Sequence, residues 1–256
     1  LALTLITLSL GGAVFISSFN VRGSLESYID QVSNYLLADV NLDFARNYRI
    51  NEIQKLALNI YGVQSIEPRG NAYCQLVTAS GEAGESVDLL GAPPESNLVQ
   101  PILLDGRWLI SGDQNAIALN EAFLKRYPEL EVGNQITLFI NRREVDWTIV
   151  GFFQFIGSDS FIVYVPLDYL NEVTGSTNQA SNYQVVATPE IVEQGLQADL
   201  AVRIDAYFRG NGFDVVSASD SGSIIGNATL GLDTLTFFLL IMSGLTAAVG
   251  SIGLMG

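Results

Sequence analysis

The sequence predicts an α+β extracytoplasmic domain flanked by two transmembrane helices. Within it we expect a split β-α-β subdomain that holds an inserted, small β-rich subdomain. Three observations support this prediction. The chain is charge-free over residues 1–21 and again over 234–256. Two strand–helix–strand patterns lie far apart in the sequence, and short strands fill the middle. Separated units of this kind can pair into one sheet with both helices on one face.

Both ends of the chain have the length and composition of membrane spans. Each run holds about the 20 apolar residues that a helix needs to cross a hydrocarbon layer ~30 Å thick. We therefore expect residues 1–21 to be a first transmembrane helix, truncated at its start, and 221–256 to be a connector and a second one. Two alternatives stay open. Residues 1–19 could be a signal peptide, although no basic segment leads them, and 234–256 could be a buried core helix. Since the chain starts at Leu and stops in an apolar run, we expect a piece of a longer protein.

The first strand–helix–strand unit follows a helical stalk expected over residues 22–38. The segment "DVNLDF" alternates polar and apolar residues, which predicts a strand with Val40, Leu42 and Phe44 inward. "RINEIQKLALNIYGV" predicts an amphipathic helix that Gly62 ends. "VQSIEPRG" and "NAYCQLVTASG" are typical of strands, and the turn-rich segment 81–97 is expected to be a mobile edge. These elements make up residues 39–100, the first part of the split subdomain.

The second unit covers residues 176–220. "SNYQVVAT" predicts a strand, and a single helix is expected over 188–212, with Thr188 at its N-cap and Pro189 at its first position. Gly210 and Gly212 are expected to end this helix. "FDVVSAS" then predicts the last strand. With this strand the second strand–helix–strand unit is complete.

Residues 101–175 predict the inserted β-rich subdomain. "NAIALNEAFLKRY" predicts a strand that runs into a short helix at Asn120. "QITLFINRREVDWTIVGFF" predicts a hairpin with Asn141 and Arg142 near its tip, and Trp147 on its apolar face. "FIVYVPLDYL" adds a strand that ends at Pro166.

Composition excludes several classes of function. Asp and Glu number 27 against 12 Lys and Arg, a net charge of −15, which argues against nucleic acid as a partner. The chain has no histidine, so Ser-His and Cys-His pairs and the usual zinc or haem ligation are excluded. Cys74 is alone and forms no internal disulfide. No glycine-rich phosphate loop is present, and the carboxylates are scattered. We expect no enzyme and no catalytic, cofactor-binding or metal-binding residue.

Small residues recur four apart within both apolar ends. Such spacing lets helix backbones approach closely in lipid, where packing drives association. The bilayer would surround these helices, and their small-residue faces would contact other helices, such as those of a partner subunit. The candidate helix-packing residues are Ser9, Ala13 and Ser17 in the first run, and Ser243, Gly244, Ala247, Ala248 and Ser251 in the last.

Three motifs resemble the FtsX-like/MacB-like permeases of ABC transporters. "LLDGRWLISGDQNAIALNEAFLKRY" resembles the family's Gly-Arg-Trp/Phe element, here Gly106, Arg107 and Trp108. "LEVGNQITLFINRREVDWTIVGFF" resembles its strand pair. "TFFLLIMSGLTAAVGSIGLMG" resembles its second membrane helix. The matching residues of the last two motifs are Val132, Gly133, Ile136, Leu138, Ile149, Val150 and Gly151, and then Gly250 and Gly253.

The resemblance implies a non-catalytic permease subunit in the cell membrane, with residues 22–232 outside the cytoplasm. It also implies that the split subdomain of the extracytoplasmic domain is porter-like. It implies an ABC ATPase on a separate chain or fused domain, a permease dimer and an extracytoplasmic accessory protein. Movement of the outer domain would then be driven by cytoplasmic ATP hydrolysis, for export, lipoprotein release or mechanotransmission. Gly106, Arg107, Trp108, Gly133 and Gly151 would have structural roles, with Arg107 paired to a nearby acid.

Two other functions fit the same plan of helix, outer domain and helix. One is the sensor domain of a two-helix receptor, such as a histidine kinase or a chemoreceptor. The other is a membrane-anchored hydrolase that works through carboxylates, which the lack of histidine and of any nucleophile motif argues against. The sequence beyond Gly256 separates a receptor from a permease, because a receptor would continue into a signalling domain and a permease into two more apolar runs.

Overall fold

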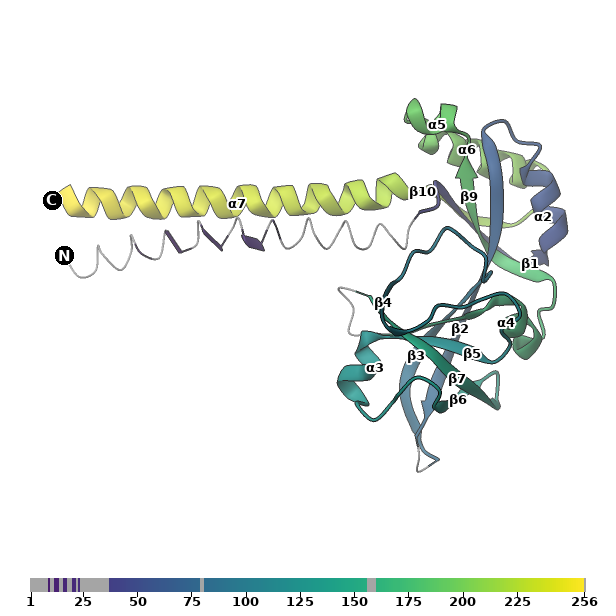
Figure 1. The fold of residues 1–256 in the computed structure, drawn as a ribbon. Coiled ribbons are helices and arrows are strands. Elements are labelled where there is room, and N and C mark those ends of the chain that lie inside the picture. Colours follow the sequence, from purple (N-terminus) through teal and green to yellow (C-terminus); the bar gives the residue numbers. More distant parts are fainter. Residues whose placement is uncertain are drawn as a thin grey trace. The chain divides into compact units, whose positions relative to one another are not determined.

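The computed structural model falls into two compact units, which are described separately. One comprises Leu1–Ser33 with Ser223–Gly256, and the other is the folded unit Asn34–Gly222. Figure 1 shows the fold, with its helices and strands labelled. The structure describes residues 9, 12–13, 16–17, 20–21, 23, 37–78, 81–155 and 160–255.

Four strands of the folded unit form an antiparallel sheet, called here the split sheet. Its order is β10 (Val215–Asp220), β1 (Val40–Arg49), β9 (Gln179–Ala187) and the first half of β2 (Val63–Val77). β1 and β2 belong to the first strand–helix–strand unit, and β9 and β10 belong to the second. Strands of the two units therefore alternate across the sheet. This is the split β-α-β arrangement that the sequence predicts.

Helices of both units cover one face of the split sheet. They are α2 (Ile50–Ala57), α5 (Pro189–Glu193) and α6 (Gln197–Gly210). Ile53 of α2 and Phe208 of α6 are fully buried in the same cluster as Leu42 and Val185 of the strands. Full burial of such side chains contributes roughly 1.5–3 kcal/mol each. The shared cluster therefore holds both helices against the sheet.

The single helix expected over 188–212 is wrong, because the chain forms α5 and α6 with a break between them. Gly195 adopts a left-handed backbone at φ 67°, and the Leu196 N–H donates to the Ile191 carbonyl at 2.9 Å. A glycine in this conformation ends a helix without strain. Thr188 lies at the N-cap position of α5 but makes no side-chain cap hydrogen bond.

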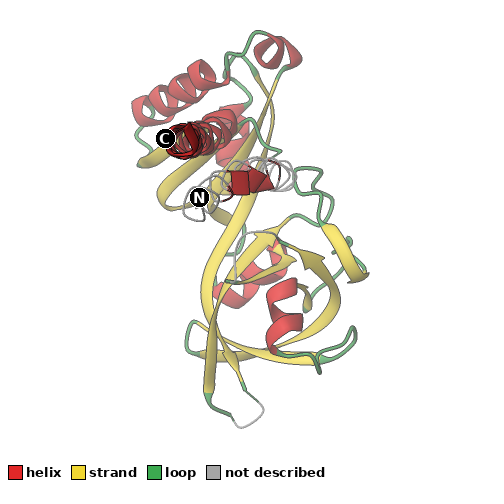
Figure 2. Ribbon diagram, turned by 90° about the vertical axis from the view of Figure 1, so that its left-hand side faces the viewer, coloured by secondary structure: helices red, strands yellow, loops and turns green. Residues whose placement is uncertain are grey.

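The remaining strands close into a barrel. Among the described residues, six strands pair in a closed ring, each with the next. The ring starts at the second half of β2, which pairs with β3 (Ala83–Ala92), and its last strand pairs with β2 again. Figure 2 shows this ring of strands below the split sheet. A closed ring leaves no unpaired edge among its own strands. In order, the ring runs β3, β8 (Phe161–Pro166), β5 (Ala116–Asn120), β7 (Arg143–Gln154) and β6 (Gln135–Ile140). The last residues of β7 pair with β4 (Ile102–Gly106).

Large apolar side chains fill the barrel. Leu89, Ile117, Leu138, Trp147 and Val163 are each fully buried there. The short helices α3 (Glu121–Arg126) and α4 (Leu167–Thr174) contribute further side chains to this core. The barrel therefore has its own core, distinct from that of the split sheet.

The mobile edge expected over 81–97 is wrong. Its first part is β3, which pairs antiparallel with β2 and parallel with β8. Val87 and Leu89 point into the barrel core and are almost fully buried, while Asp88 between them is only half-buried. The segment was predicted as a turn-rich edge because glycines and prolines flank a short run of alternating buried and less buried residues, which is the pattern of a strand. Sheet pairing thus groups β3 with the strands of 101–175, and the expected domain limits at 100 and 176 stay predictions.

The predicted hairpin is confirmed as β6 and β7. Asn141 and Arg142 form its two-residue turn, with φ values of 47° and 67°. Two positive φ values match the type I′ turn, whose twist suits a two-residue hairpin. Trp147 lies on the buried face, as expected.

The helix α7 (Ser221–Met255) accounts for the C-terminal run. Most of 1–21 and of the expected stalk 22–38 lies outside the described residues. Across the part of the chain that the structure describes, no helix reaches the combined length and hydropathy required of a membrane span. The two expected transmembrane helices are therefore not shown.

A close approach of two backbones fixes β4 on β7. Gly106 and Gly151 are paired in register, and the Arg107 N–H donates to the Val150 carbonyl at 2.9 Å. A Cβ added at Gly151 would collide with the carbonyl oxygen of Arg107 and lie 2.9 Å from its nitrogen. Both obstacles are backbone atoms, which have little freedom to move away.

We therefore predict that Gly151→Ala destabilises the protein by about 2–3 kcal/mol through overpacking. Thermal or urea unfolding of the variant measures this loss. Gly210→Ala is the matched control, since nothing lies within 4 Å of a Cβ there, and its stability should be unchanged or slightly raised. Equal stability of the two variants would contradict the close approach.

Candidate functional site

The two sheets meet along one strand, in a region called here the junction. Residues 63–69 of β2 pair with β9, ending at Arg69 opposite Asn182. From Gly70, opposite Gly91, the same strand pairs with β3. The junction is therefore a continuous strand rather than a linker.

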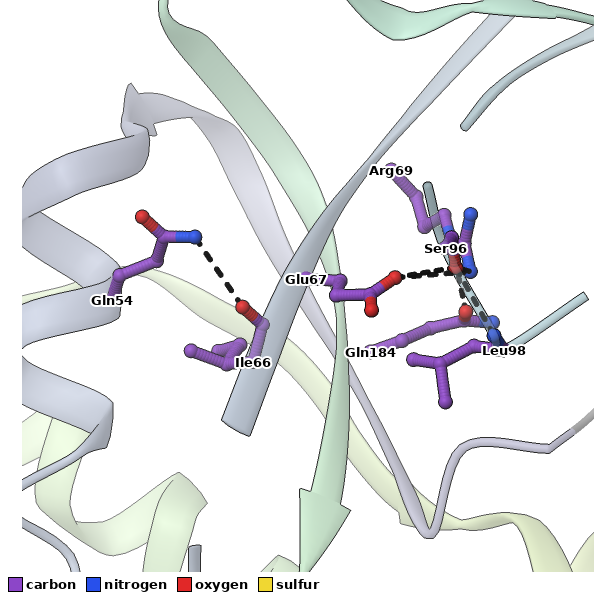
Figure 3. A network of polar contacts seen from close by, with 7 residues as sticks. All are labelled: Gln54, Ile66, Glu67, Arg69, Ser96, Leu98 and Gln184. Carbon is purple, nitrogen blue, oxygen red and sulfur yellow. Dashed lines mark hydrogen bonds and ion pairs between the residues drawn. The ribbon is translucent and has the colours of Figure 1, made fainter. Parts of the chain in front are cut away.

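A polar network surrounds Arg69 at the junction, as Figure 3 shows. Its Nε donates to Oε1 of Gln184 at 2.7 Å, and its Nη2 donates to Oγ of Ser96 at 2.9 Å. Nη2 also lies 3.6 Å from Oε2 of Glu67 in an ion pair. Ser96 closes the network by donating its hydroxyl to the same Glu67 oxygen at 2.5 Å. The network joins β2, β9 and the segment after β3.

Burial sets the electrostatics of this network. The Arg69 side chain is only 11% exposed, and desolvation lowers its pKa, while the charge of Glu67 raises it. A guanidinium keeps its proton under such a shift, because its ordinary pKa exceeds 12. Arg69 thus holds a buried positive charge that Glu67 balances. Its Nη1 atom is buried and has no hydrogen-bond partner among the described residues.

Sequence reasoning missed this network. Glu67 and Arg69 lie two apart in a strand, so their side chains share one face, and that spacing of opposite charges was the available signal. Ser96 lies in the segment that was expected to be mobile. Nothing in the local sequence links Gln184, 115 positions away, to Arg69.

The described residues offer little for catalysis or metal binding. Among them, no group of three or more His, Cys, Asp or Glu side chains is placed to hold a metal ion. Cys74 is buried, and burial raises the pKa of its thiol to about 12. A nucleophilic cysteine needs a lowered pKa, so Cys74 is a core residue.

The Gly-Arg-Trp element lies where β4 ends. Arg107 forms a two-pronged ion pair with Asp113, at 2.7 and 2.9 Å, which raises the pKa of Arg107 and lowers that of Asp113. The Trp108 ring packs against Phe153 and Tyr164, with centroids 5.7 and 5.2 Å apart. These contacts hold the segment after β4 on the barrel.

The glycines of the two family motifs occupy restricted backbone positions. Gly106 and Gly133 have φ values of 71° and 92°, which favour glycine. The Gly133 N–H donates to the Ile149 carbonyl at 2.8 Å. Together with Gly151 they shape the turns around β7, and their expected structural role stays a prediction.

The candidate helix-packing residues differ in exposure. Ser243 of α7 is 3% exposed, whereas Gly244 and Ala248 are exposed. In the first run, Ser9, Ala13 and Ser17 are exposed. The side chains of Ala247 and Ser251 lie outside the described residues. The packing role of these residues therefore stays a prediction.

Comparison with known proteins identifies the fold. The family model described as MacB-like periplasmic core domain matches residues 1–202. The periplasmic region of MacB from Actinobacillus actinomycetemcomitans has a similar structure, with TM-score 0.54 and 15% identity over 75% of this chain and 94% of that one. The extracellular domain of the noncanonic ABC-type transporter YknZ from Gram-positive bacteria aligns with TM-score 0.49 and 14% identity, over 72% and 98%. A search of curated proteins finds no match.

The family match and the fold agree. The match includes the first strand–helix–strand unit, the whole barrel, and the second unit as far as residue 202 within α6. The structural likeness to the MacB periplasmic region covers nearly all of that region. The chain therefore belongs to the family of MacB-like periplasmic core domains of ABC transporter permeases.

Proposed function

We propose that this chain is part of a permease subunit of the FtsX/MacB type, which couples cytoplasmic ATP hydrolysis to movement of an extracytoplasmic domain. The observation that supports this most is the family match over residues 1–202, because it joins the first apolar run and the folded unit in one region. An ABC ATPase would supply the free energy, and a second permease subunit and an accessory protein would complete the assembly.

The folded unit is suited to receive a movement at its two chain ends. β1 begins the unit and β10 ends it, and the two pair with Val40 opposite Asp220. The Ser221 N–H donates to the Asp39 carbonyl at 3.0 Å, and Asn41 Nδ2 donates to Ser221 Oγ at 3.0 Å. These bonds clamp the points where the chain enters and leaves. A displacement of either point would therefore be passed to both strands.

A bilayer around the two charge-free ends would explain the surface of α7. Large apolar side chains on this helix are strongly exposed, including Phe237, Phe238 and Met242 at about 60% each. Contiguous apolar surface of this kind marks a protein or membrane contact. Residues 22–232 would then lie outside the cytoplasm, in a multi-pass protein of the cell membrane.

One prediction of the proposed function concerns the expected stalk. Inserting two Gly-Pro pairs after Ser33 should leave ATPase activity intact but abolish ATP-dependent movement of the outer domains, because proline breaks a helix. The measurement uses the permease with its ATPase in proteoliposomes, and follows the distance between spin labels at Tyr73→Cys in the two copies. Tyr73 is 79% exposed, and native Cys74 is buried.

The control for this experiment is the same insertion after Gly81, an exposed residue between β2 and β3 with nothing within 4 Å of a Cβ. There the ATP-dependent distance change should persist. If it also persists with the insertion after Ser33, the stalk does not transmit the movement.

Another prediction of the proposed function concerns the position of α7 in the bilayer. A membrane-impermeant maleimide added to spheroplasts should label Tyr73→Cys quickly and Phe238→Cys only after solubilisation. The two side chains are 79% and 59% exposed, so in water cysteines at both positions would react readily, because reactivity follows exposure and thiolate character. Fast labelling of Phe238→Cys in the intact membrane would contradict the proposal that α7 lies within the bilayer.

A further inference from the structure

A polar cavity at the junction has no part in the proposed coupling. It lies between the split sheet and the barrel, and has a volume of about 260 Å³. That volume is just below the range of small-molecule sites, roughly 300–1,000 Å³, and the cavity opens to solvent, so a ligand would project from its mouth. Its walls come from both sheets: Asn47 and Ser181 from the split sheet, and Asn71, Asn141 and Asn171 from the barrel side.

Two unpaired donors belong to residues that line this cavity. Four buried side-chain atoms in the described part of the chain lack a hydrogen-bond partner, and two of them belong to cavity residues. They are Nη1 of Arg69 and Nδ2 of Asn171, and Asn171 is only 6% exposed. Buried polar groups are nearly always paired, so each exception needs an explanation. Both atoms are covered in this structure, so a turn of each side chain toward the cavity would let the acceptor atoms of a ligand pair with them.

The other lining groups define what such a ligand offers. The described residues that line the cavity include no Asp or Glu, and apart from Arg69 their polar side chains are amides and hydroxyls. Amides and hydroxyls both donate and accept hydrogen bonds. Since Glu67 already balances the charge of Arg69, the site is neutral overall. The groups that it matches best are sugar hydroxyls, which also donate and accept.

An aromatic ring completes this pattern at the mouth. Tyr73 lines the cavity and is 79% exposed, so its ring is open to a ligand. An aromatic side chain presents an apolar face together with a polar tip, which suits the apolar face of a sugar ring. We propose that this cavity binds a neutral saccharide of one or two rings, with Arg69 and Asn171 donating to its oxygens and Tyr73 stacking on it.

The test is calorimetric titration of the full chain in phosphatidylcholine nanodiscs, because alkyl-glycoside detergents would themselves present sugars. The probes are cellobiose and diacetylchitobiose, both neutral, and cellobionate as the carboxylate analogue. We expect at least one neutral disaccharide to bind below ~1 mM and more tightly than cellobionate.

Asn171→Leu is the decisive variant. It replaces an unpaired buried donor by an apolar group, which should keep or raise the melting temperature, while it weakens disaccharide binding about tenfold or more. Tyr73→Ser, at an exposed position, should weaken binding about fivefold or more without affecting stability. Asn51→Leu, on the exposed side of α2 and outside the cavity, is the matched control and should bind as the unaltered chain does.

Three results would overturn the proposal. The first is no binding of either neutral disaccharide up to ~10 mM. The second is unchanged binding by Asn171→Leu, which would reduce Asn171 to a structural residue. The third is tighter binding of cellobionate, which would assign the cavity to anions. None of these results bears on ATP-dependent movement, which the stalk insertion tests separately.

Discussion

The continuity of β2 is the constraint on which the folded unit depends. One strand of 15 residues supplies hydrogen bonds to the split sheet in its first half and to the barrel in its second. At the crossing, Gly70 and Gly91 let α4 lie directly on the backbone, since a Cβ at either would come within 2.7 Å of Leu170. The two cores are therefore joined by packed backbone, and no flexible linker separates them.

The sequence predicted the elements whose pattern is local. Alternation of Val40, Leu42 and Phe44 indicated β1, and Asn141 at the turn indicated the hairpin, because period and turn chemistry act over a few residues. Closure of the barrel was not predictable in this way. It needs Gln75 to pair with Phe139, and a pairing between such distant residues leaves no local signal. β3 was missed because glycines and prolines flank its short alternation.

The same division applies to the candidate site. An acid for Arg107 was expected, and Asp113 lies six residues away. The network at Arg69 was not expected, because Ser96 and Gln184 reach it from other parts of the chain. Burial is what makes Arg69 informative, and a single sequence gives no direct measure of burial. An unpaired donor such as Nδ2 of Asn171 is a property of packed coordinates alone.

The movement proposed for the whole unit and the saccharide proposed for the junction involve different degrees of freedom. The first displaces the clamped ends at β1 and β10, whereas the second depends on the angle between the two sheets, because both sheets line the cavity. A ligand shifts an equilibrium only by its differential affinity for the two states. If displacement of β1 alters that angle, sugar affinity must change with it, and by linkage the sugar must alter the displacement equally. Under that condition, the junction would link sugar binding to the ATP-driven movement that we propose.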